Sequence, residues 1–167
     1  MIGTLVLTTP TGDFSALVHD DVVVGGGFRG IDELVSRLET GLREQRAASA
    51  PLPWLADALG KYFGGTVDAL DHLPVRQPGT PLRQRMWEAL RGVTAGEPVA
   101  YGELAARAGS PRAARAAGTA CAINKVALIV PCHRVVRSGG DVGNYGYGVP
   151  VKRWLLEHEH ASAAASA

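Results

Sequence analysis

Alternating apolar and polar positions in the first part of the chain predict β-strands. Residues 4–8 and 14–19 are rich in β-branched and aromatic side chains, and a turn over residues 10–13 separates them. Residues 22–24 form a third short run, and glycines 25–27 after it allow a turn or a bulge. We therefore expect three short strands over the first 27 residues.

Helical spacing of apolar residues follows these strands. Residues 31–42 carry apolar side chains every three or four positions, and residues 54–63 repeat the pattern after Pro51 or Pro53 and before a Gly-Gly pair. Residues 70–80, with two prolines and a glycine, resemble a linker. Residues 1–75 are therefore predicted to form a small module of strands and helices.

The next segment is helical and contains a tight turn. Residues 82–93 place apolar side chains on one face, and residues 101–108 form a short helix that Gly109 closes. Ser110 is a good N-cap and Pro111 a good first residue for an alanine-rich helix that runs to about residue 122. Two helices joined in this way resemble a helix-turn-helix, although an αα-hairpin without any role in DNA binding has the same pattern.

The last third of the chain alternates between apolar and glycine-rich segments. Residues 126–130 are apolar and predict a buried strand, residues 144–148 predict a loop, and residues 152–159 predict the last helix. A second domain is expected over residues 80–160, and the alanine- and serine-rich residues 161–167 are expected to be a disordered tail.

Composition narrows the class of protein. The chain has 167 residues, of which 46% are hydrophobic and 20% charged, as expected for a soluble globular protein. No apolar run approaches the roughly 20 residues of a membrane helix, and no basic segment precedes the first apolar residues as in a secretory signal. We therefore expect a cytoplasmic protein that does not associate with membranes.

Charge is distributed unevenly along the chain. Residues 1–75 contain five basic and ten acidic residues, a net charge of −5, whereas residues 76–137 contain ten basic and three acidic residues, a net charge of +7. A basic middle segment indicates a polyanionic partner, although ordinary surface variation has the same effect. Arg112 and Arg115, near the start of the second predicted helix of the turn, are where a recognition helix would meet DNA.

Two cysteines carry the candidate chemistry. They form no CxxC motif and have no paired histidines nearby, so neither a metal site nor a disulfide is expected, and Cys121 is interpreted as a small buried apolar residue. Cys132 precedes His133, and an imidazole can take the proton that a thiol must lose before it attacks. In an extended segment the two side chains point to opposite sides, so His133 would need a water or a bend to reach the thiol. Taken alone, the pair is more typical of a buried structural cysteine than of a catalytic one.

The sequence around Cys132 is more specific than the pair itself. Residues 126–136, Val-Ala-Leu-Ile-Val-Pro-Cys-His-Arg-Val-Val, resemble the active-site signature of the O6-alkylguanine-DNA alkyltransferases. Further segments resemble other motifs of that family in the same order: residues 85–90, 99–105, 111–118, 143–145 and 152–156. The resemblance covers about residues 80–160, whereas residues 1–75 match only loosely.

This resemblance implies a fold and a function. The fold class is α+β, with a small RNase H-like α/β module followed by a winged-helix domain that contains the helix-turn-helix. The implied function is repair of DNA by direct reversal, in which an alkyl group moves irreversibly from O6-alkylguanine in double-stranded DNA to Cys132. Each molecule would act once, as a monomer in the minor groove and without a cofactor, after flipping the damaged nucleotide out of the duplex. Cooperative assembly on DNA stays open.

The resemblance also assigns roles to individual residues. Cys132 aligns with the alkyl acceptor, His133 with its base, Glu159 with the carboxylate that orients the histidine, and Asn124 with the asparagine that supports the turn beneath the site. Tyr101 aligns with the tyrosine that donates to guanine N3. The remaining assignments concern DNA contacts, namely Arg115, Arg112, Ala116 and Arg134, and the substrate pocket, namely Val135, Tyr145, Gly146 and Lys152.

Several alternatives compete with this interpretation. A lesion-binding protein without catalysis shares the family's fold but lacks the acceptor cysteine, and a winged-helix regulator would use Cys132 as a redox sensor. A hydrolytic Cys-His enzyme would need a glycine-rich oxyanion segment, which does not accompany Cys132. Lys125 and Ala127 replace residues that are often proline in the family, which predicts weaker reaction with benzyl adducts than with methyl adducts.

Overall fold

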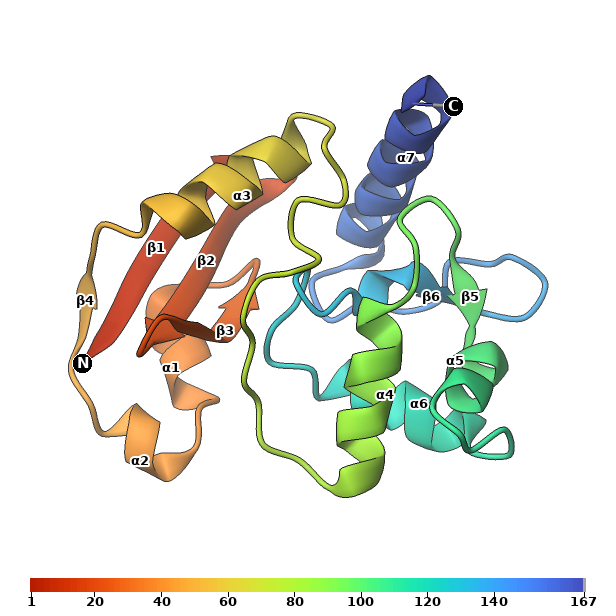
Figure 1. Cartoon of the computed structure of the whole chain (residues 1–167), viewed down its shortest axis with the longest axis horizontal. Helices are drawn as coiled ribbons and strands as arrows, with labels where there is room; N and C mark the ends of the chain where they lie inside the picture. Colours follow the sequence, from red (N-terminus) through yellow and green to blue (C-terminus); the bar gives the residue numbers. More distant parts are fainter. Residues whose placement is uncertain (167) are drawn as a thin grey trace. The chain divides into compact units, whose positions relative to one another are not determined.

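An antiparallel hairpin begins the chain in the computed structural model, which describes residues 1–166. Strands β1 (Ile2–Thr9) and β2 (Gly12–His19) pair directly, and β3 (Val22–Gly27) continues the sheet antiparallel to β2. The short strand β4 (Ala47–Ser49), which the sequence did not predict, pairs parallel with β1 and completes the order β3-β2-β1-β4 (Figure 1). The three predicted strands are confirmed, and each is longer than its apolar run.

Three helices accompany this sheet. The segment expected to be one helix over residues 31–42 is two short ones, α1 (Ile31–Ser36) and α2 (Thr40–Arg43), and α3 (Pro53–Phe63) follows as predicted. Leu34, Leu38 and Leu42 still share one core with the sheet residues Ile2 and Leu17. Burial of these leucines depends on where their side chains lie. The break between α1 and α2 therefore leaves the core intact.

The chain packs as two compact units that are not simple halves. The first unit comprises Met1–Pro78 together with Lys125–Ile129, and the second contains Gly79–Asn124 and the residues from Val130 onward. The sequence predicted a continuous second domain over residues 80–160, but five residues within that range pack with the first unit. The coarse class, α+β, agrees with the prediction.

Lys125–Ile129 joins the first unit through β3. The amide of Gly26 donates to the carbonyl of Lys125, and the amide of Ala127 donates back to the carbonyl of Gly26, each at 2.9 Å. The predicted strand over residues 126–130 is wrong: the only bridge in it joins Val126 to Gly26, and Leu128 has a left-handed φ of 71°. The segment is buried as expected, but it forms a turn.

The second unit is mainly helical. It contains α4 (Pro81–Arg91), α5 (Tyr101–Arg107), α6 (Ala114–Ala122) and α7 (Val149–Ser166), and strands β5 (Val99–Ala100) and β6 (Val135–Val136) form a short parallel pair. Thr80 caps α4 by accepting from the amide of Arg83, and the indole of Trp87 donates to the carbonyl of Ala120 at 2.9 Å. This buried bond fixes α4 against α6.

Two predicted boundaries differ from the structure. Ser110 does not cap a helix that starts at Pro111; residues 110–113 form a turn in which the amide of Ala113 donates to the carbonyl of Ser110, and α6 starts at Ala114. The tail expected to be disordered from Ala161 continues α7 as far as Ser166, because alanine is the residue most favourable to helix. Residue 167, the last of that predicted tail, lies outside the described residues.

No helix within residues 1–166 combines the length and the apolar character that crossing a membrane requires.

Candidate active site around Cys132

One 3₁₀ turn presents the candidate nucleophile. The helix η1 (Cys132–Arg134) lies between Val130 and β6, and the amides of Cys132 and Arg134 donate to the carbonyls of Val130 and Pro131. The extended segment assumed for Cys132 and His133 is therefore wrong, and the two side chains leave the backbone about 120° apart. The 3₁₀ turn supplies a bend between the two residues, and Cys132 is 8% exposed while His133 is fully buried.

His133 is held by a carboxylate from the last helix. Its Nε2 lies 2.7 Å from Oε1 of Glu159, and both side chains are fully buried. An ionised carboxylate only accepts hydrogen bonds, so Nε2 carries the proton and Nδ1 presents the basic lone pair. Nδ1 is buried and has no hydrogen-bond partner among the described residues. The geometry leaves this nitrogen available to take a proton.

Glu159 is an ionised group inside the protein. Burial alone would raise the pKa of this carboxyl, but the charges and hydrogen bonds of His133 and Arg134 outweigh burial and lower the pKa of Glu159 to about 2. The carboxylate therefore keeps its charge at neutral pH and orients the imidazole.

Arg134 lies inside the protein and not, as predicted, at a surface that could contact DNA. Its guanidinium is buried, donates from Nε to both carboxylate oxygens of Glu159 at 3.1 Å and from Nη2 to Oε1 at 3.0 Å, and donates from Nη1 to the carbonyl of Val93 at 2.8 Å. We therefore withdraw the assignment to DNA, since a guanidinium committed to internal partners does not face a phosphate. The Val93 carbonyl is an acceptor that sequence reasoning missed.

Asn124 and Lys152 surround the thiol with polar groups. The side-chain amide of Asn124 donates to the carbonyl of Val130 at 2.8 Å and is buried. Burial raises the pKa of the Cys132 thiol, while hydrogen bonding by Asn124 and the charge of Lys152 act in the opposite direction. Asn124 and Lys152 therefore favour the thiolate of Cys132, whereas burial of the sulfur favours the neutral thiol.

Lys152 is itself buried and bonded to backbone. Its Nζ donates to the carbonyl of Val135 at 2.6 Å and to the carbonyl of Asn144 at 3.2 Å, and burial lowers its pKa. One side chain from α7 therefore joins β6 to the loop that carries Tyr145 and Gly146. In that loop Tyr145 is half-buried, its ring packs edge-on against Tyr147 at 5.3 Å, and Gly146 is exposed.

Tyr101 and Cys121 belong to the same electrostatic neighbourhood. Tyr101 begins α5 and is half-buried, and burial, followed by the influence of Cys121 and Cys132, raises the pKa of its hydroxyl. It therefore stays a hydrogen-bond donor at neutral pH. Cys121 is only partly buried, not fully as expected, and its pKa is raised far above the usual range, first by burial and then by Cys132.

The predicted DNA contacts on the helical turn differ in exposure. Arg112 is exposed in the turn before α6, Arg115 is exposed in the first turn of α6, and Ala116 beside it is half-buried. The Arg115 carbonyl accepts from the Thr119 hydroxyl one turn further along α6. Both guanidinium groups are available to a partner on this surface.

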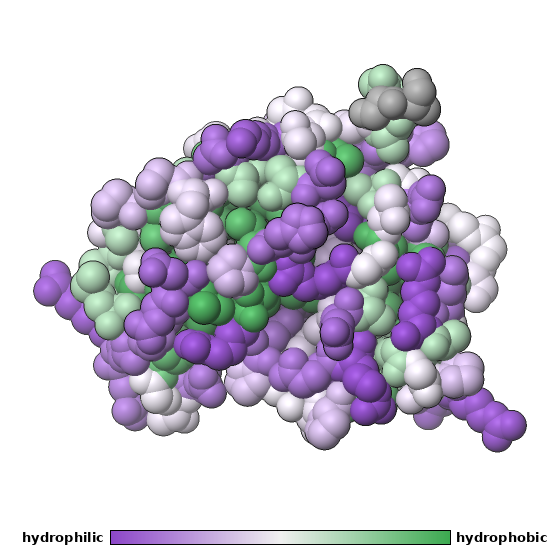
Figure 2. Space-filling model, viewed as in Figure 1, coloured by the Kyte–Doolittle hydropathy of each residue, from purple (hydrophilic) through white to green (hydrophobic). Residues whose placement is uncertain are grey.

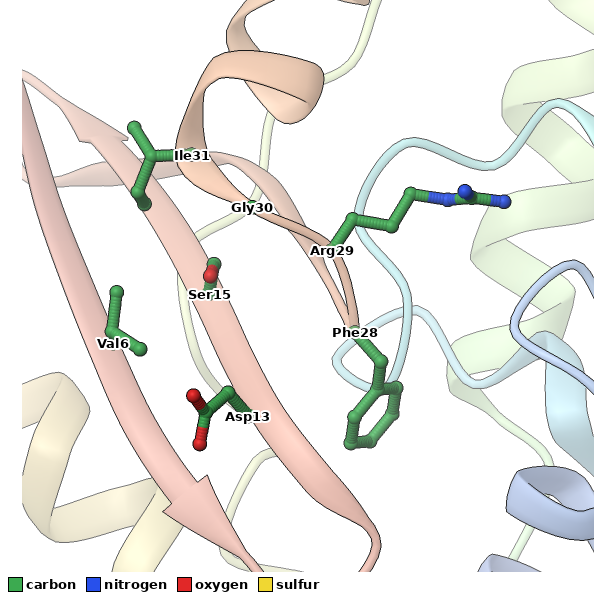
Figure 3. Close-up of a pocket in the computed structure, with 7 residues that line it drawn as sticks. All are labelled: Val6, Asp13, Ser15, Phe28, Arg29, Gly30 and Ile31. Atoms are coloured by element: carbon green, nitrogen blue, oxygen red, sulfur yellow. The ribbon is translucent and has the colours of Figure 1, made fainter.

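The first unit has a separate hollow on its sheet. A pocket of about 340 Å³ is lined by Val6, Asp13, Ser15, Phe28, Arg29, Gly30 and Ile31. Figure 3 shows the side chains of Val6, Ser15 and Ile31 over the strands, whereas Arg29 extends away from them, and Figure 2 shows apolar atoms at the surface of this unit. The lining contains no cysteine and no imidazole, and residues 1–166 contain no cluster of His, Cys, Asp and Glu suited to a metal.

The chain is similar in sequence to proteins of one known family. Residues 81–161 match the family described as 6-O-methylguanine DNA methyltransferase, DNA binding domain. The methylated-DNA–protein-cysteine methyltransferase of Salmonella typhimurium is 44% identical over 105 residues, which cover 63% of this chain. The matched stretch spans 61% of the Salmonella protein's own length.

Solved structures extend the similarity to nearly the whole chain. The O6-methylguanine methyltransferase of Mycobacterium tuberculosis has a TM-score of 0.79 and 32% identity, and the match covers 97% of this chain and 94% of that one. The M. tuberculosis OGT solved in complex with DNA has the same TM-score and identity, with 96% and 94% covered. With Cys132, His133 and Glu159 in one buried cluster, the chain belongs to the O6-methylguanine-DNA methyltransferase family.

Proposed function

We propose that this protein repairs alkylated DNA by moving an alkyl group, chiefly methyl, from O6 of guanine to Cys132. The observation that carries this proposal is the pairing of a buried nucleophile with an oriented base. Cys132 and His133 are consecutive in one 3₁₀ turn, and Glu159 fixes the imidazole at 2.7 Å with its unbonded nitrogen buried beside them in the second unit. Neither a lesion sensor nor a redox regulator requires this arrangement.

The reaction balances without a co-reactant. The thiol proton of Cys132 passes through a water to Nδ1 of His133, and the thiolate attacks the alkyl carbon in line with the bond to O6. An S–C bond forms as the C–O6 bond breaks, and the electron pair stays on guanine. Tyr101, whose raised pKa keeps its hydroxyl protonated, donates to guanine N3 and offsets that charge. Cys132 loses one proton and the guanine anion gains one, so the reaction as a whole neither releases nor consumes a proton.

The product explains why each molecule would act once. Transfer leaves a thioether on Cys132, and a thioether sulfur has no proton through which His133 can reverse the step. No cofactor enters the scheme, because the nucleophile, the base and the donor are all side chains of the second unit. The protein is consumed stoichiometrically.

Helices α5 and α6 are the proposed DNA-binding surface. They would form the helix-turn-helix of a winged-helix domain and approach the minor groove, with Arg112 on the backbone and Ala116 allowing close approach. Arg115 would fill the space that the flipped nucleotide leaves, because a planar guanidinium both stacks and donates. The exposure of both arginines and the DNA complex of the M. tuberculosis OGT support this proposal.

The loop after β6 is the proposed wall of the base pocket. The carbonyls of Cys132 and Val135 would accept from the guanine amine, the Gly146 amide would face O6, and Tyr145 would pack on the base. The Val135 carbonyl already accepts from Lys152 but retains a second lone pair. We further propose that the sheet unit is RNase H-like and that the protein acts as a monomer; the order β3-β2-β1-β4, with only β4 parallel to its neighbour, supports the former.

The decisive experiment follows a labelled methyl group. The protein is incubated with duplex DNA that carries ¹³C-methyl on guanine O6, and the label is located by peptide mass spectrometry. We expect one label per molecule on Cys132, none in a Cys132→Ser variant, and normal transfer in a Cys121→Ser variant. DNA binding without any label on the wild-type protein would overturn the proposal in favour of a lesion sensor.

A further inference from the structure

Arg134 shares the carboxylate of Glu159 with His133 and also contacts the oxygen that His133 does not use. The guanidinium contacts both carboxylate oxygens at 3.0–3.1 Å, while the imidazole contacts Oε1 at 2.7 Å, so one buried carboxylate is shared between a permanent cation and a titratable ring. A third bond, from Nη1 to the carbonyl of Val93 at 2.8 Å, fixes the guanidinium from the segment after α4. The alkyl-transfer scheme above uses His133 and Glu159 but not this arginine.

The charge of Arg134 matters because of what a lone carboxylate would do. A negative charge within hydrogen-bond distance favours the protonated form of an imidazole, and the effect is strong where water is excluded. A His133 that is already protonated at neutral pH has no lone pair with which to accept the thiol proton. A bidentate guanidinium compensates most of the carboxylate charge while leaving the hydrogen bond to Nε2 in place.

We infer that Arg134 is a positioning residue whose charge keeps His133 unprotonated at rest and keeps Glu159 a carboxylate, so that the thiol proton comes to rest on the imidazole. This inference rests on the proposed function for its consequence but on the buried trio for its geometry. It differs from a purely structural ion pair because it gives Arg134 and Glu159 opposite effects on the protonation of His133.

The other ionisable groups of the neighbourhood lie toward the thiol. Among the described residues four of these influence one another's ionisation: Cys132 on η1, Lys152 on α7, Tyr101 on α5 and Cys121 on α6. Arg137 and Asp141, which follow β6, also act on Lys152. Glu159 responds to His133 and Arg134. All four groups on the thiol side are unchanged in the variants below, so differences between the variants report the charge of the Arg134–Glu159 pair.

The test measures His133 directly by ¹⁵N NMR of histidine-labelled protein across pH, with its signal identified by its loss in His133→Gln. In Arg134→Met we expect His133 to stay protonated to a pH about one unit higher than in wild type, and in Glu159→Gln to lose its proton at a lower pH. In the double variant the midpoint should return toward wild type, and Arg134→Lys should stay near it. Methyl transfer at pH 7 should fall about two- to fivefold in Arg134→Met and recover as pH is raised.

The outcomes separate the two proposals. Midpoints that move in the same direction in Arg134→Met and Glu159→Gln, or that do not move in Arg134→Met, would overturn the role of Arg134. If Arg134→Met does not fold, Arg134→Gln replaces it, since glutamine keeps a donor but no charge, and the same shift is expected. Wild-type protein that transfers no methyl group would refute the proposed function, and the NMR midpoints would still decide the inference.

Discussion

Nζ of Lys152 lies 2.6 Å from the carbonyl oxygen of Val135, three residues beyond the nucleophile Cys132. A second bond, to the carbonyl of Asn144 at 3.2 Å, makes this ammonium the link between β6 and the glycine-rich loop before α7. The same charge favours the thiolate of Cys132. One buried side chain thus holds the proposed pocket together and assists the ionisation of the nucleophile.

Replacing this lysine should therefore have two effects. In Lys152→Met we expect the free energy of unfolding to fall by about 1–3 kcal/mol, because the buried carbonyl of Val135 and the part-buried carbonyl of Asn144 lose their donor. We also expect Cys132 to require a higher pH to react with iodoacetamide, measured by peptide mass spectrometry. Arg153→Met is the matched control, since Arg153 is adjacent but exposed. Equal behaviour of the two variants would contradict the role given to Lys152.

The exposed arginine of α6 should contribute to DNA affinity. In Arg115→Ala we expect weaker binding to duplex DNA and a shallower dependence of affinity on salt, because the duplex loses both the guanidinium proposed to stack within it and the positive charge of that group. Fluorescence anisotropy at two or more salt concentrations measures both. Arg43→Ala, at an exposed site of the acidic first unit, should leave affinity and slope unchanged. An unaltered salt dependence in Arg115→Ala would count against α6 as the contact surface.

Gly96 is required where the segment after α4 meets α7. It has a φ of +86°, and a Cβ at this position would lie 2.9 Å from Cβ of Ala163 and 3.4 Å from the carbonyl of Glu159. Gly96→Ala should lower the free energy of unfolding in urea by about 1–3 kcal/mol, from backbone strain and crowding together. Gly60→Ala, in the exposed interior of α3 with nothing within 4 Å, should instead raise it by about 0.5–1 kcal/mol.

Stability should fall in acid because of Glu159. Its pKa is lowered from 4.5 to about 2 in the folded protein, so its contribution to stability is complete above about pH 4.5 and is lost as pH falls toward 2. Urea unfolding at pH 7, 4 and 3 should show this loss in the wild type. Glu159→Gln should be less stable at pH 7, and its stability should change less across the same range. A parallel pH dependence in the two proteins would exclude Glu159 as the source.

Much of the fold was predictable because its signals are local. The apolar runs of β1 to β3 and the helical spacing of α3 and α4 appear within single elements, so no distant contact was needed to interpret them. The buried segment Lys125–Ile129 has the composition of a strand, yet it pairs at only one point and turns at Leu128. Its conformation depends on Gly26, about a hundred positions earlier, which no local pattern reveals.

The site residues divide in the same way, into those that the sequence predicted and one whose place depends on a distant contact. Cys132, His133 and Glu159 were predicted from a resemblance, and the structure brings them together in one cluster. Arg134 was misassigned because arginine is almost always at the surface unless a partner buries it, and that partner lies 25 positions away. Its position between Pro131 and the apolar pair Val135 and Val136 was the available signal that it points inward.

The five residues Lys125–Ile129 pack with the sheet unit, although the residues on either side of them belong to the second unit, which contains Cys132. They end three positions before Cys132, and two backbone hydrogen bonds join them to Gly26. We therefore expect that a fragment produced by a protease cut in residues 70–78 would not be catalytically active by itself. Residues 125–129, which lead to Cys132, would lose their hydrogen bonds to Gly26. The chain therefore passes from the second unit into the first at Lys125 and returns at Val130, two positions before Cys132.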